Sequence, residues 1–152
     1  MKAPRVLFVC TGNAGRSQMA EAMFATRYAG HVETFSAGVE PWPALHPMAV
    51  KLMVEQGVDM AGRYPKHARI FAEAPLDVVV TIGDRARAEA GPFRARPLRL
   101  HWDIPDPAEA DGTPDSEWVF RRACQAIQDR FPELLRILAR LAEGHVPDPG
   151  FA

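Results

Sequence analysis

The sequence has little cysteine, little lysine and no excess of charge. Of its 152 residues only Cys10 and Cys124 are cysteines, fewer than a disulfide-stapled secreted domain usually carries. Only three of the 18 basic residues are lysines, and the formal net charge is -1. A chain without excess positive charge has no bulk field that attracts nucleic acid or an anionic membrane. We therefore expect neither of these as a partner.

Long hydrophobic runs and internal repeats are also missing. The apolar run near the N-terminus, residues 6–10, is too short for a signal-peptide core or a membrane span. We therefore expect a cytoplasmic protein, in a compartment that keeps thiols reduced. The length suits one hydrophobic core, so we predict a single domain over residues 1–144. Residues 145–152, which contain two prolines, are predicted to be a disordered tail.

Apolar strand-like runs alternate with helix-like segments along the chain. The pattern predicts strands near 5–10, 31–36, 76–82 and 97–102, and helices near 16–29, 47–56, 85–90 and 115–142. Pro132 should kink or split the last helix, and residues 58–73 are left open apart from a short helix near 70–74. Such alternation is typical of an α/β fold. We predict a doubly wound, four-stranded parallel sheet of order 2-1-3-4, with ligands bound beyond the carboxyl end of the first strand.

The most informative segment joins the first strand to the first helix. It reads Cys10-Thr-Gly-Asn-Ala-Gly-Arg16-Ser17, and its glycines permit tight turns. A loop of this kind points backbone N–H groups inward, and the helix N-terminus adds partial positive charge. An anion of the size of phosphate, sulfate or arsenate fits such a concavity. The predicted oxyanion-binding residues are Thr11, Gly12, Asn13, Ala14, Gly15 and Arg16.

The same segment favours a reactive thiolate at Cys10. The helix N-terminus and the guanidinium of Arg16 both favour the charged form of a nearby thiol. Arg16 also offers a planar fork for two oxygens of the ligand, and the Ser17 hydroxyl can donate to the Cys10 sulfur. The alternative is that Cys10 is a small buried residue at a strand end. The strand–loop–helix context favours the nucleophile.

Attack of a thiolate on an oxyanion expels an oxygen that needs a proton, and a carboxylic acid on a facing loop can supply it. Asp106 follows the last predicted strand and therefore lies at the same sheet edge as Cys10. Pro107 would stiffen its backbone and aim the carboxyl group. Asp103 is the second candidate and Asp84, after the third strand, is the third. The alternative for Asp106 is a turn-forming Asp-Pro.

Together, these segments resemble the arsenate reductases built on the low-molecular-weight protein tyrosine phosphatase fold. The likeness runs from about residue 4 to residue 140, and its matching pieces are 10–21, 36–38, 46–50, 77–81, 101–102 and 106–107. The resemblance implies that Cys10 is the nucleophile, Arg16 the oxyanion clamp and Asp106 the general acid. A non-catalytic oxyanion binder is disfavoured because both Cys10 and Asp106 are present.

The resemblance leaves two reactions open. Phosphatases of this fold place aromatic residues after the second strand and after the catalytic Asp-Pro. Here Pro107 is followed by Ala108, and Trp42 is either one pocket wall or a filler between two prolines. We therefore expect arsenate reduction. The alternative is a low-molecular-weight protein tyrosine phosphatase that hydrolyses phosphate monoesters through a phospho-cysteine.

The resemblance also bears on the reductant. Thioredoxin-coupled reductases of this kind carry two further cysteines after the third strand, where this chain has Gly83 and Gly91. Cys124 lies in the last predicted helix at core spacing, so we expect it to be buried. A lone catalytic cysteine implies an external thiol, glutathione or mycothiol, that resolves the Cys10–arsenic adduct. A glutaredoxin-like or thioredoxin-like protein would then be the partner.

A potassium ion is a further implication of the resemblance. Some of these enzymes bind one near the loop, and Asn13, Glu21 and Ser36 match that site, while Pro65 stands in place of another ligand. The alternative is that Asn13 braces the loop and that Glu21 is a carboxylate in the first helix. No tightly bound cofactor is expected.

Overall fold

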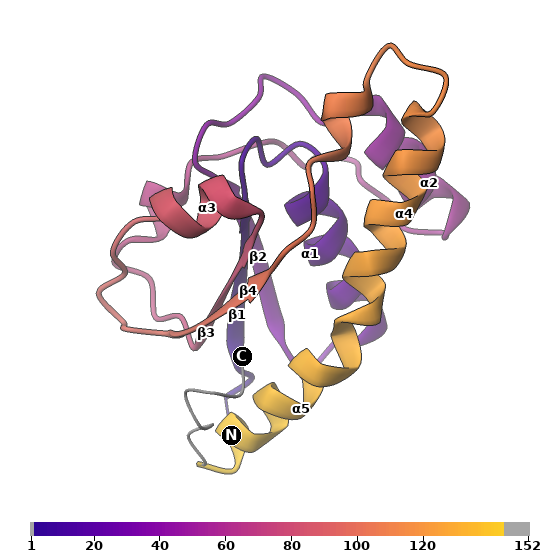
Figure 1. The fold of residues 1–152 in the computed structure, drawn as a ribbon. Coiled ribbons are helices and arrows are strands. Elements are labelled where there is room, and N and C mark those ends of the chain that lie inside the picture. Colours follow the sequence, from indigo (N-terminus) through magenta and orange to yellow (C-terminus); the bar gives the residue numbers. More distant parts are fainter. Residues whose placement is uncertain (1, 145–152) are drawn as a thin grey trace.

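A computed structural model describes residues 2–144 and shows a parallel sheet between two layers of helices (Figure 1). The strands are β1 (Arg5–Cys10), β2 (Glu33–Gly38), β3 (Val78–Ile82) and β4 (Leu98–Trp102). All three neighbouring pairs are parallel and the order is β2-β1-β3-β4. The predicted α/β fold and strand order are confirmed. The tail prediction for 145–152 lies outside the described residues.

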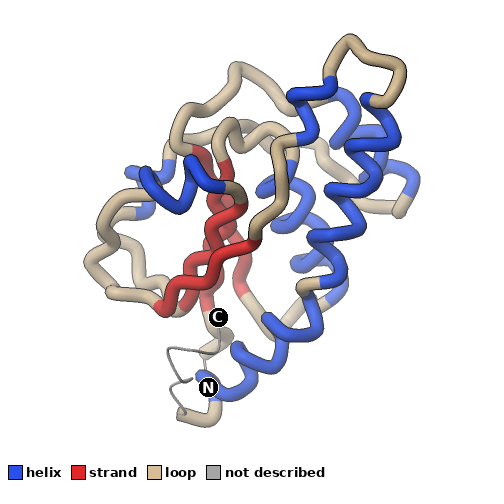
Figure 2. The backbone as a smooth tube through the Cα atoms, in the orientation of Figure 1, coloured by secondary structure: helices blue, strands red, loops and turns tan. Residues whose placement is uncertain are grey.

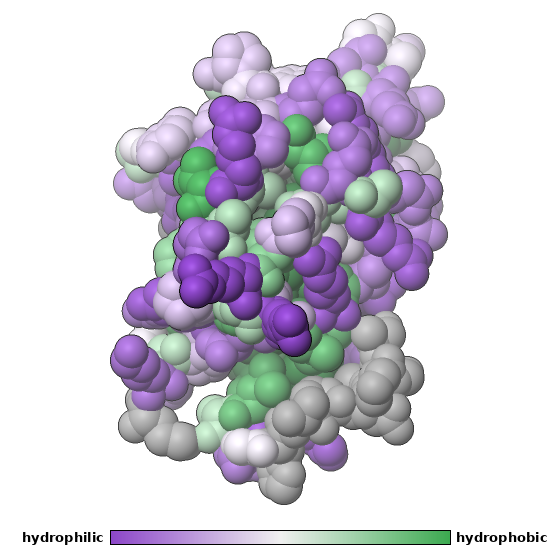
Figure 3. All heavy atoms as spheres, turned by 90° about the vertical axis from the view of Figure 1, so that its left-hand side faces the viewer, coloured by the Kyte–Doolittle hydropathy of each residue, from purple (hydrophilic) through white to green (hydrophobic). Residues whose placement is uncertain are grey.

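The helices divide unevenly between the two faces of the sheet. They are α1 (Arg16–Arg27), α2 (Pro47–Glu55), α3 (Asp84–Glu89), α4 (Ser116–Asp129) and α5 (Phe131–Ala142), with short 3-10 helices η1 (Ala68–Phe71) and η2 (Pro107–Ala110). The side of the sheet that carries α1, α2, α4 and α5 lies opposite the side that carries α3 (Figures 1 and 2). The α3 side presents mostly hydrophilic residues with smaller hydrophobic areas between them (Figure 3).

Pro132 splits the last predicted helix in two. Proline lacks a backbone N–H and its ring collides with the carbonyl four residues earlier, so it is tolerated only in the first turn. The structure places it there: α4 ends at Asp129, Arg130 links the helices, and α5 begins at Phe131. Neither α4, α5 nor any other helix within residues 2–144 has the length and apolar character to cross a bilayer.

Two hydrophobic cores lie on the two faces of the sheet, and β1 contributes to both. Val6 and Phe8 pack with the larger helical layer, whereas Leu7 and Val9 pack on the α3 side; all four are fully buried. Successive side chains of a strand point to opposite faces. A central parallel strand therefore needs apolar residues at every position, which explains the continuous apolar run.

The carboxyl ends of the four strands bring distant segments together. The loop 11–15 follows β1, residues 39–46 follow β2, Gly83 follows β3 and residues 103–106 follow β4. Residues 58–73, which the sequence left open, contain η1, and His67 makes a parallel bridge to Gly38 at the end of β2. All chemistry predicted for the chain lies at this edge.

Candidate active site

The loop after β1 is a cradle whose carbonyl groups point outward. The oxygens of Cys10, Thr11, Gly12 and Ala14 accept backbone hydrogen bonds of 2.9–3.2 Å from the N–H groups of Val39, Glu40, Trp42 and His46. In a trans peptide the N–H points opposite to the carbonyl. The N–H groups of residues 11, 12, 13 and 15 are therefore directed away from the 39–46 segment, into the loop. One of them, Asn13 N–H, donates to Cys10 Sγ at 3.3 Å.

Glycine is required at two points where other chain segments approach this loop. A Cβ on Gly38 would lie 2.6 Å from the Thr11 carbonyl oxygen. A Cβ on Gly12 would lie 2.6 Å from the indole of Trp42. Real Cβ atoms do not approach other atoms this closely, so both glycines allow the loop to be packed tightly from outside. Tight packing fixes the direction of the inward N–H groups.

Cys10 lies at the floor of the cradle, beside a chain of polar side chains. It is 2% exposed, and its Sγ is 2.9 Å from Ser17 Oγ. Asn13 Nδ2 donates to Ser17 Oγ at 2.7 Å, so the Ser17 hydroxyl proton is directed elsewhere, with the Cys10 sulfur at 2.9 Å and the Ala37 carbonyl oxygen at 3.3 Å as its two acceptors. Asn13 itself has a left-handed backbone with φ of +52°. Ser17, the predicted hydrogen-bond partner of the thiol, is therefore in contact with it.

Arg16 is the first residue of α1, and its guanidinium lies across the loop. Nη1 donates to the Ile104 carbonyl at 2.7 Å, and Nη2 donates to Thr11 Oγ1 at 3.5 Å. The residue is only 4% exposed. A guanidinium has five N–H donors in a fixed fork, so donors remain for an oxyanion in the cradle.

Gly83 provides the space that the Arg16 side chain occupies. Its φ is +91°, and a Cβ at this position would lie 2.5 Å from Arg16 Nη1. This is one of the two positions where the resemblance implies a further cysteine in thioredoxin-coupled reductases. In this chain it holds the guanidinium instead.

We expect Gly83→Ala to weaken phosphate binding by about tenfold or more, because the methyl group displaces a guanidinium that makes charged hydrogen bonds to the anion. Gly91→Ala is the matched control: Gly91 has the same φ of +91°, and no atom lies within 4 Å of where its Cβ would stand. Both variants place an alanine at a φ of +91°, which alanine rarely adopts. Isothermal titration with phosphate should separate them, and equal affinities would contradict this role of Gly83.

Asp106 lies at the rim of the pocket that has Cys10 at its floor. Both residues line this pocket, together with Arg16. Asp106 Oδ1 accepts the Ala108 N–H at 3.0 Å as the N-cap of η2, and Oδ2 lies 3.6 Å from Arg16 Nη2. The carboxyl group is therefore held in place and about one third exposed, at 35%.

The other two acid candidates lie elsewhere. Asp84 and Asp103 are grouped with His101, and neither lines the pocket over Cys10. Position in the sequence places all three aspartates at one sheet edge. The structure distinguishes them: Asp106 lines the pocket over Cys10, and Asp84 and Asp103 do not.

Aromatic residues from distant segments form the remaining walls. Trp42, His46 and Phe120 line the pocket, with ring centroids 5.7 Å apart for Trp42 and His46 and 4.5 Å apart for His46 and Phe120. Trp42 is 40% exposed, so it forms a wall rather than a buried filler. Phe120 is not predictable as a site residue from the sequence, because nothing local distinguishes it from other core positions of α4.

His46 joins the start of α2 to the loop that carries Asp106. Its Nδ1 accepts the Met48 N–H at 3.0 Å, so the ring proton is on Nε2, which donates to Asp111 Oδ2 at 2.8 Å. The two partners are 65 positions apart. No local pattern in the sequence predicts this pair.

Comparison with known proteins adds to this geometry. The sequence matches the family described as low molecular weight phosphotyrosine protein phosphatase over residues 5–146. This match spans nearly the whole chain. The chain belongs to this family. The resemblance found in the sequence is therefore confirmed, and the chain is an enzyme.

Several relatives within the family are arsenate reductases. One from Shouchella clausii is 37% identical over 82% of this chain and 90% of its own length. A glutaredoxin arsenate reductase from Synechocystis sp. is 30% identical over 86% of this chain and 95% of its own length. Among solved structures, a Corynebacterium glutamicum thioredoxin-dependent arsenate reductase has a TM-score of 0.64 and 25% identity over 88% of this chain. This chain spans only 62% of that structure.

The second cysteine of this family member is buried in α4. Cys124 is 4% exposed, and Gln56 and Gln128 each donate an amide N–H to its sulfur at 3.6 and 3.5 Å. Burial raises the pKa of the Cys124 thiol, and the two amide hydrogen bonds only partly oppose this. The prediction of a buried Cys124 is confirmed.

We expect iodoacetamide at pH 7 to label Cys10, which lines a pocket, and to leave Cys124 unlabelled in the folded protein, because the raised pKa of Cys124 keeps its thiol protonated and unreactive. Mass spectrometry of the two cysteine peptides measures this. A Cys124→Ser variant should keep full turnover. Labelling of Cys124 at the same rate as Cys10 would contradict the assignment.

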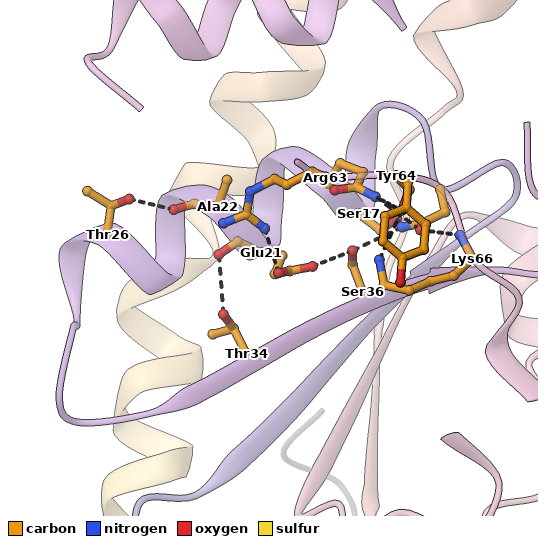
Figure 4. Close-up of polar contacts among 11 residues, drawn as sticks. Ser17, Glu21, Ala22, Thr26, Thr34, Ser36, Arg63, Tyr64 and Lys66 are labelled. Atoms are coloured by element: carbon orange, nitrogen blue, oxygen red, sulfur yellow. Dashed lines mark hydrogen bonds and ion pairs between the residues drawn. The ribbon is translucent and has the colours of Figure 1, made fainter. Parts of the chain in front are cut away.

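Glu21 connects the loop to β2 and to residues 63–66 (Figure 4). Its Oε1 accepts the Ser36 hydroxyl at 2.6 Å, and its Oε2 accepts Arg63 Nη1 at 2.6 Å. Ser36 Oγ in turn accepts Asn13 Nδ2 at 3.0 Å. The three residues predicted for a potassium site therefore do lie together, as one hydrogen-bonded network.

The residues present do not fit a potassium ion. Asn13 Oδ1 already accepts hydrogen bonds from Gln18 Nε2 and from the Lys66 backbone N–H, at 3.1 and 3.0 Å. Arg63 supplies the positive charge beside Glu21. Burial lowers the pKa of Lys66, with Glu21 opposing and Arg63 adding to the effect. The oxygens of Asn13 and Glu21 already accept hydrogen bonds, and Arg63 and Lys66 already bring positive charge to this network. This environment does not favour a potassium ion, and we assign no chemistry to potassium.

We expect Arg63→Met to lower the free energy of unfolding by about 1–3 kcal/mol, because it leaves the largely buried Glu21 carboxylate without its charge partner. Urea denaturation measures the loss. Arg69→Met, at an exposed arginine of η1, is the control and should change stability little. Equal stabilities of the two variants would show that the Glu21 pair contributes nothing.

Proposed function

We propose that this enzyme is an arsenate reductase that needs an external thiol. Arsenate would lie in the cradle, with its equatorial oxygens on the inward N–H groups and on the Arg16 fork. Cys10 Sγ then attacks arsenic, and the opposite oxygen leaves. The observation that carries the proposal is the position of Cys10 at the floor of this cradle, with Arg16 across it and Asp106 at its rim.

Two side chains would handle charge and protons in the first step. Ser17 Oγ, 2.9 Å from Cys10 Sγ, donates a hydrogen bond to the sulfur and stabilises the attacking thiolate. Asp106 protonates the leaving oxygen, which departs as water. The product is a covalent Cys10–arsenate adduct.

An external thiol would complete the reaction. Its sulfur attacks Cys10 Sγ, and the sulfur–arsenic bond breaks with its electron pair on arsenic. Arsenic is thereby reduced from the +5 to the +3 state and leaves as arsenite, while the two thiols become a mixed disulfide. A second thiol, on a glutaredoxin-like or thioredoxin-like protein, then exchanges with this disulfide and restores Cys10.

The thiols of the chain support an external reductant. Within residues 2–144 the only cysteines are Cys10 and Cys124, and Cys124 is buried among α4 contacts with a raised pKa. Gly83 and Gly91 offer no sulfur. Glutathione or mycothiol is the class of thiol proposed. A reducing compartment, the cytoplasm, would supply it.

Phosphate monoester hydrolysis is the second candidate. Arsenate and phosphate have nearly the same shape and charge, so the cradle accepts both, and the Trp42 wall offers a face for an aryl ring. Hydrolysis would use the same first step, followed by attack of water on a phospho-cysteine. The identity of the curated relatives supports the reductase.

A paired assay tests the proposal. Arsenite release is measured with glutathione or mycothiol plus a glutaredoxin or thioredoxin system, and p-nitrophenyl phosphate hydrolysis is measured on the same preparation. We expect thiol-dependent arsenite release and slow phosphate hydrolysis. Fast p-nitrophenyl phosphate hydrolysis, with no arsenite release under any combination of thiol and redoxin, would show that the enzyme is a phosphatase and not an arsenate reductase.

A further inference from the structure

A second group of metal-ligating side chains lies outside the pocket over Cys10. His101 is the second-last residue of β4, Asp103 follows this strand, and Asp84 begins α3 after β3. One ligand atom from each of the three lies within 4.8 Å of the other two. His101 Nε2 is 3.9 Å from Asp84 Oδ1. Nothing in the proposed reaction uses these residues.

Thr81 contacts the other ring nitrogen of His101. Thr81 Oγ1 lies 3.3 Å from the Leu100 carbonyl oxygen and 2.8 Å from His101 Nδ1. When the single hydroxyl proton of Thr81 goes to the Leu100 carbonyl, Nδ1–H is the donor to Thr81 and Nε2 carries a lone pair that can bind a metal ion.

The Nε2 lone pair has no partner of its own. Its atom is buried and makes no hydrogen bond within the described part of the chain. It is directed toward the Asp84 carboxylate, which is also an acceptor. Burial lowers the pKa of His101, and the positive charge of Arg87 adds to this against Asp103 and Asp84.

We propose that Asp84, His101 and Asp103 bind a divalent first-row transition metal ion such as Zn²⁺. One imidazole nitrogen and two carboxylates are ligands that such ions accept, with waters in the remaining positions. Ligands about 2.0–2.2 Å from one ion stand up to roughly 4.3 Å apart. Asp84, with a side chain 93% exposed, is free to rotate by the small amount required. The His101–Thr81 hydrogen bond is the kind of outer contact that fixes a metal-binding imidazole.

The position of this metal site links it to Arg16. Gly83, directly before Asp84, packs on the guanidinium, and Ile104, directly after Asp103, accepts its hydrogen bond. A metal ion that joins Asp84 to Asp103 would tie these two contacts of Arg16 together. The metal is a structural clamp at the sheet edge and takes no part in the chemistry at Cys10.

The test uses full-length protein carrying Cys10→Ser and Cys124→Ser, because free thiols would themselves bind Zn²⁺. After chelation, Zn²⁺ is titrated by isothermal calorimetry, and the imidazole ¹⁵N resonances are followed by NMR. We expect one Zn²⁺ per chain and a shift of the His101 Nε2 resonance. His101→Gln and Asp103→Asn should each weaken binding by tenfold or more.

Exposed residues outside the cluster provide matched controls. His31→Gln and Asp59→Asn, made in the same background, should bind Zn²⁺ like the parent. Circular dichroism in chelator checks that every variant is folded. If His101→Gln does not fold, Asp103→Asn still tests the site, because Asp103 is an exposed side chain whose replacement does not disturb the core. The proposal is overturned if binding is not saturable, or if His101→Gln and Asp103→Asn bind as the controls do. Loss of binding in His46→Asn instead would place the metal at the His46–Asp111 pair and also overturn it.

Discussion

Replacing Cys10 with serine is expected to abolish both arsenate reduction and phosphate ester hydrolysis while oxyanion binding persists. A serine hydroxyl is a far weaker nucleophile than a thiolate and cannot form the disulfide that releases arsenite. Removing a catalytic nucleophile lowers turnover by roughly four orders of magnitude or more. The cradle N–H groups and Arg16 remain, so phosphate affinity should stay within about threefold of the parent value.

The two readouts of this variant are arsenite release and phosphate titration. Cys124→Ser is the matched control, since it removes the other thiol and should leave both turnover and affinity unchanged. Turnover of Cys10→Ser above a few per cent of the parent would show that another group attacks. Loss of phosphate binding would show that the thiol itself holds the anion.

Asp106→Asn is expected to lower the rate of the first step by roughly 10²–10⁴-fold, the range of general acid catalysis. An amide of nearly the same size keeps the N-cap contact with Ala108 but has no acidic proton to give. The loss should be large for arsenate and for phenyl phosphate and small for p-nitrophenyl phosphate, whose leaving oxygen needs no proton. Single-turnover rates with the three substrates measure this.

The other two aspartates at the same edge provide the controls for Asp106→Asn. Asp84→Asn and Asp103→Asn, assayed in chelator, should keep the parent rate because neither lines the pocket over Cys10. If Asp106→Asn were as fast as the parent and one of these were slow, that residue would be the acid.

The sequence was informative about the elements because their signals are local. β1 ends at Cys10 and α1 begins at Arg16, as predicted, since an apolar run and a helical period bound a glycine-containing loop. Strand order followed from the alternation of strands and helices together with the rules for doubly wound sheets. The boundary between α4 and α5 followed from a single proline, Pro132.

The parts of the site that the sequence did not predict depend on contacts between distant segments. Arg63 meets Glu21 across 42 positions and His46 meets Asp111 across 65. Periodicity reports which face of an element is buried, but it does not report which side chain of another element lies opposite. Gly83 is a further example. The sequence shows only that a glycine stands where related reductases have a cysteine, whereas the structure shows that this glycine makes room for the Arg16 guanidinium.

Mass spectrometry after a single turnover tests the central claim most directly. The protein is mixed with arsenate and excess glutathione without any redoxin, and the cysteine peptides are then analysed. The account predicts one glutathione on Cys10, none on Cys124, and no adduct when arsenate is omitted. A Cys10–Cys124 disulfide, or an unmodified Cys10 after arsenite has been released, would contradict it.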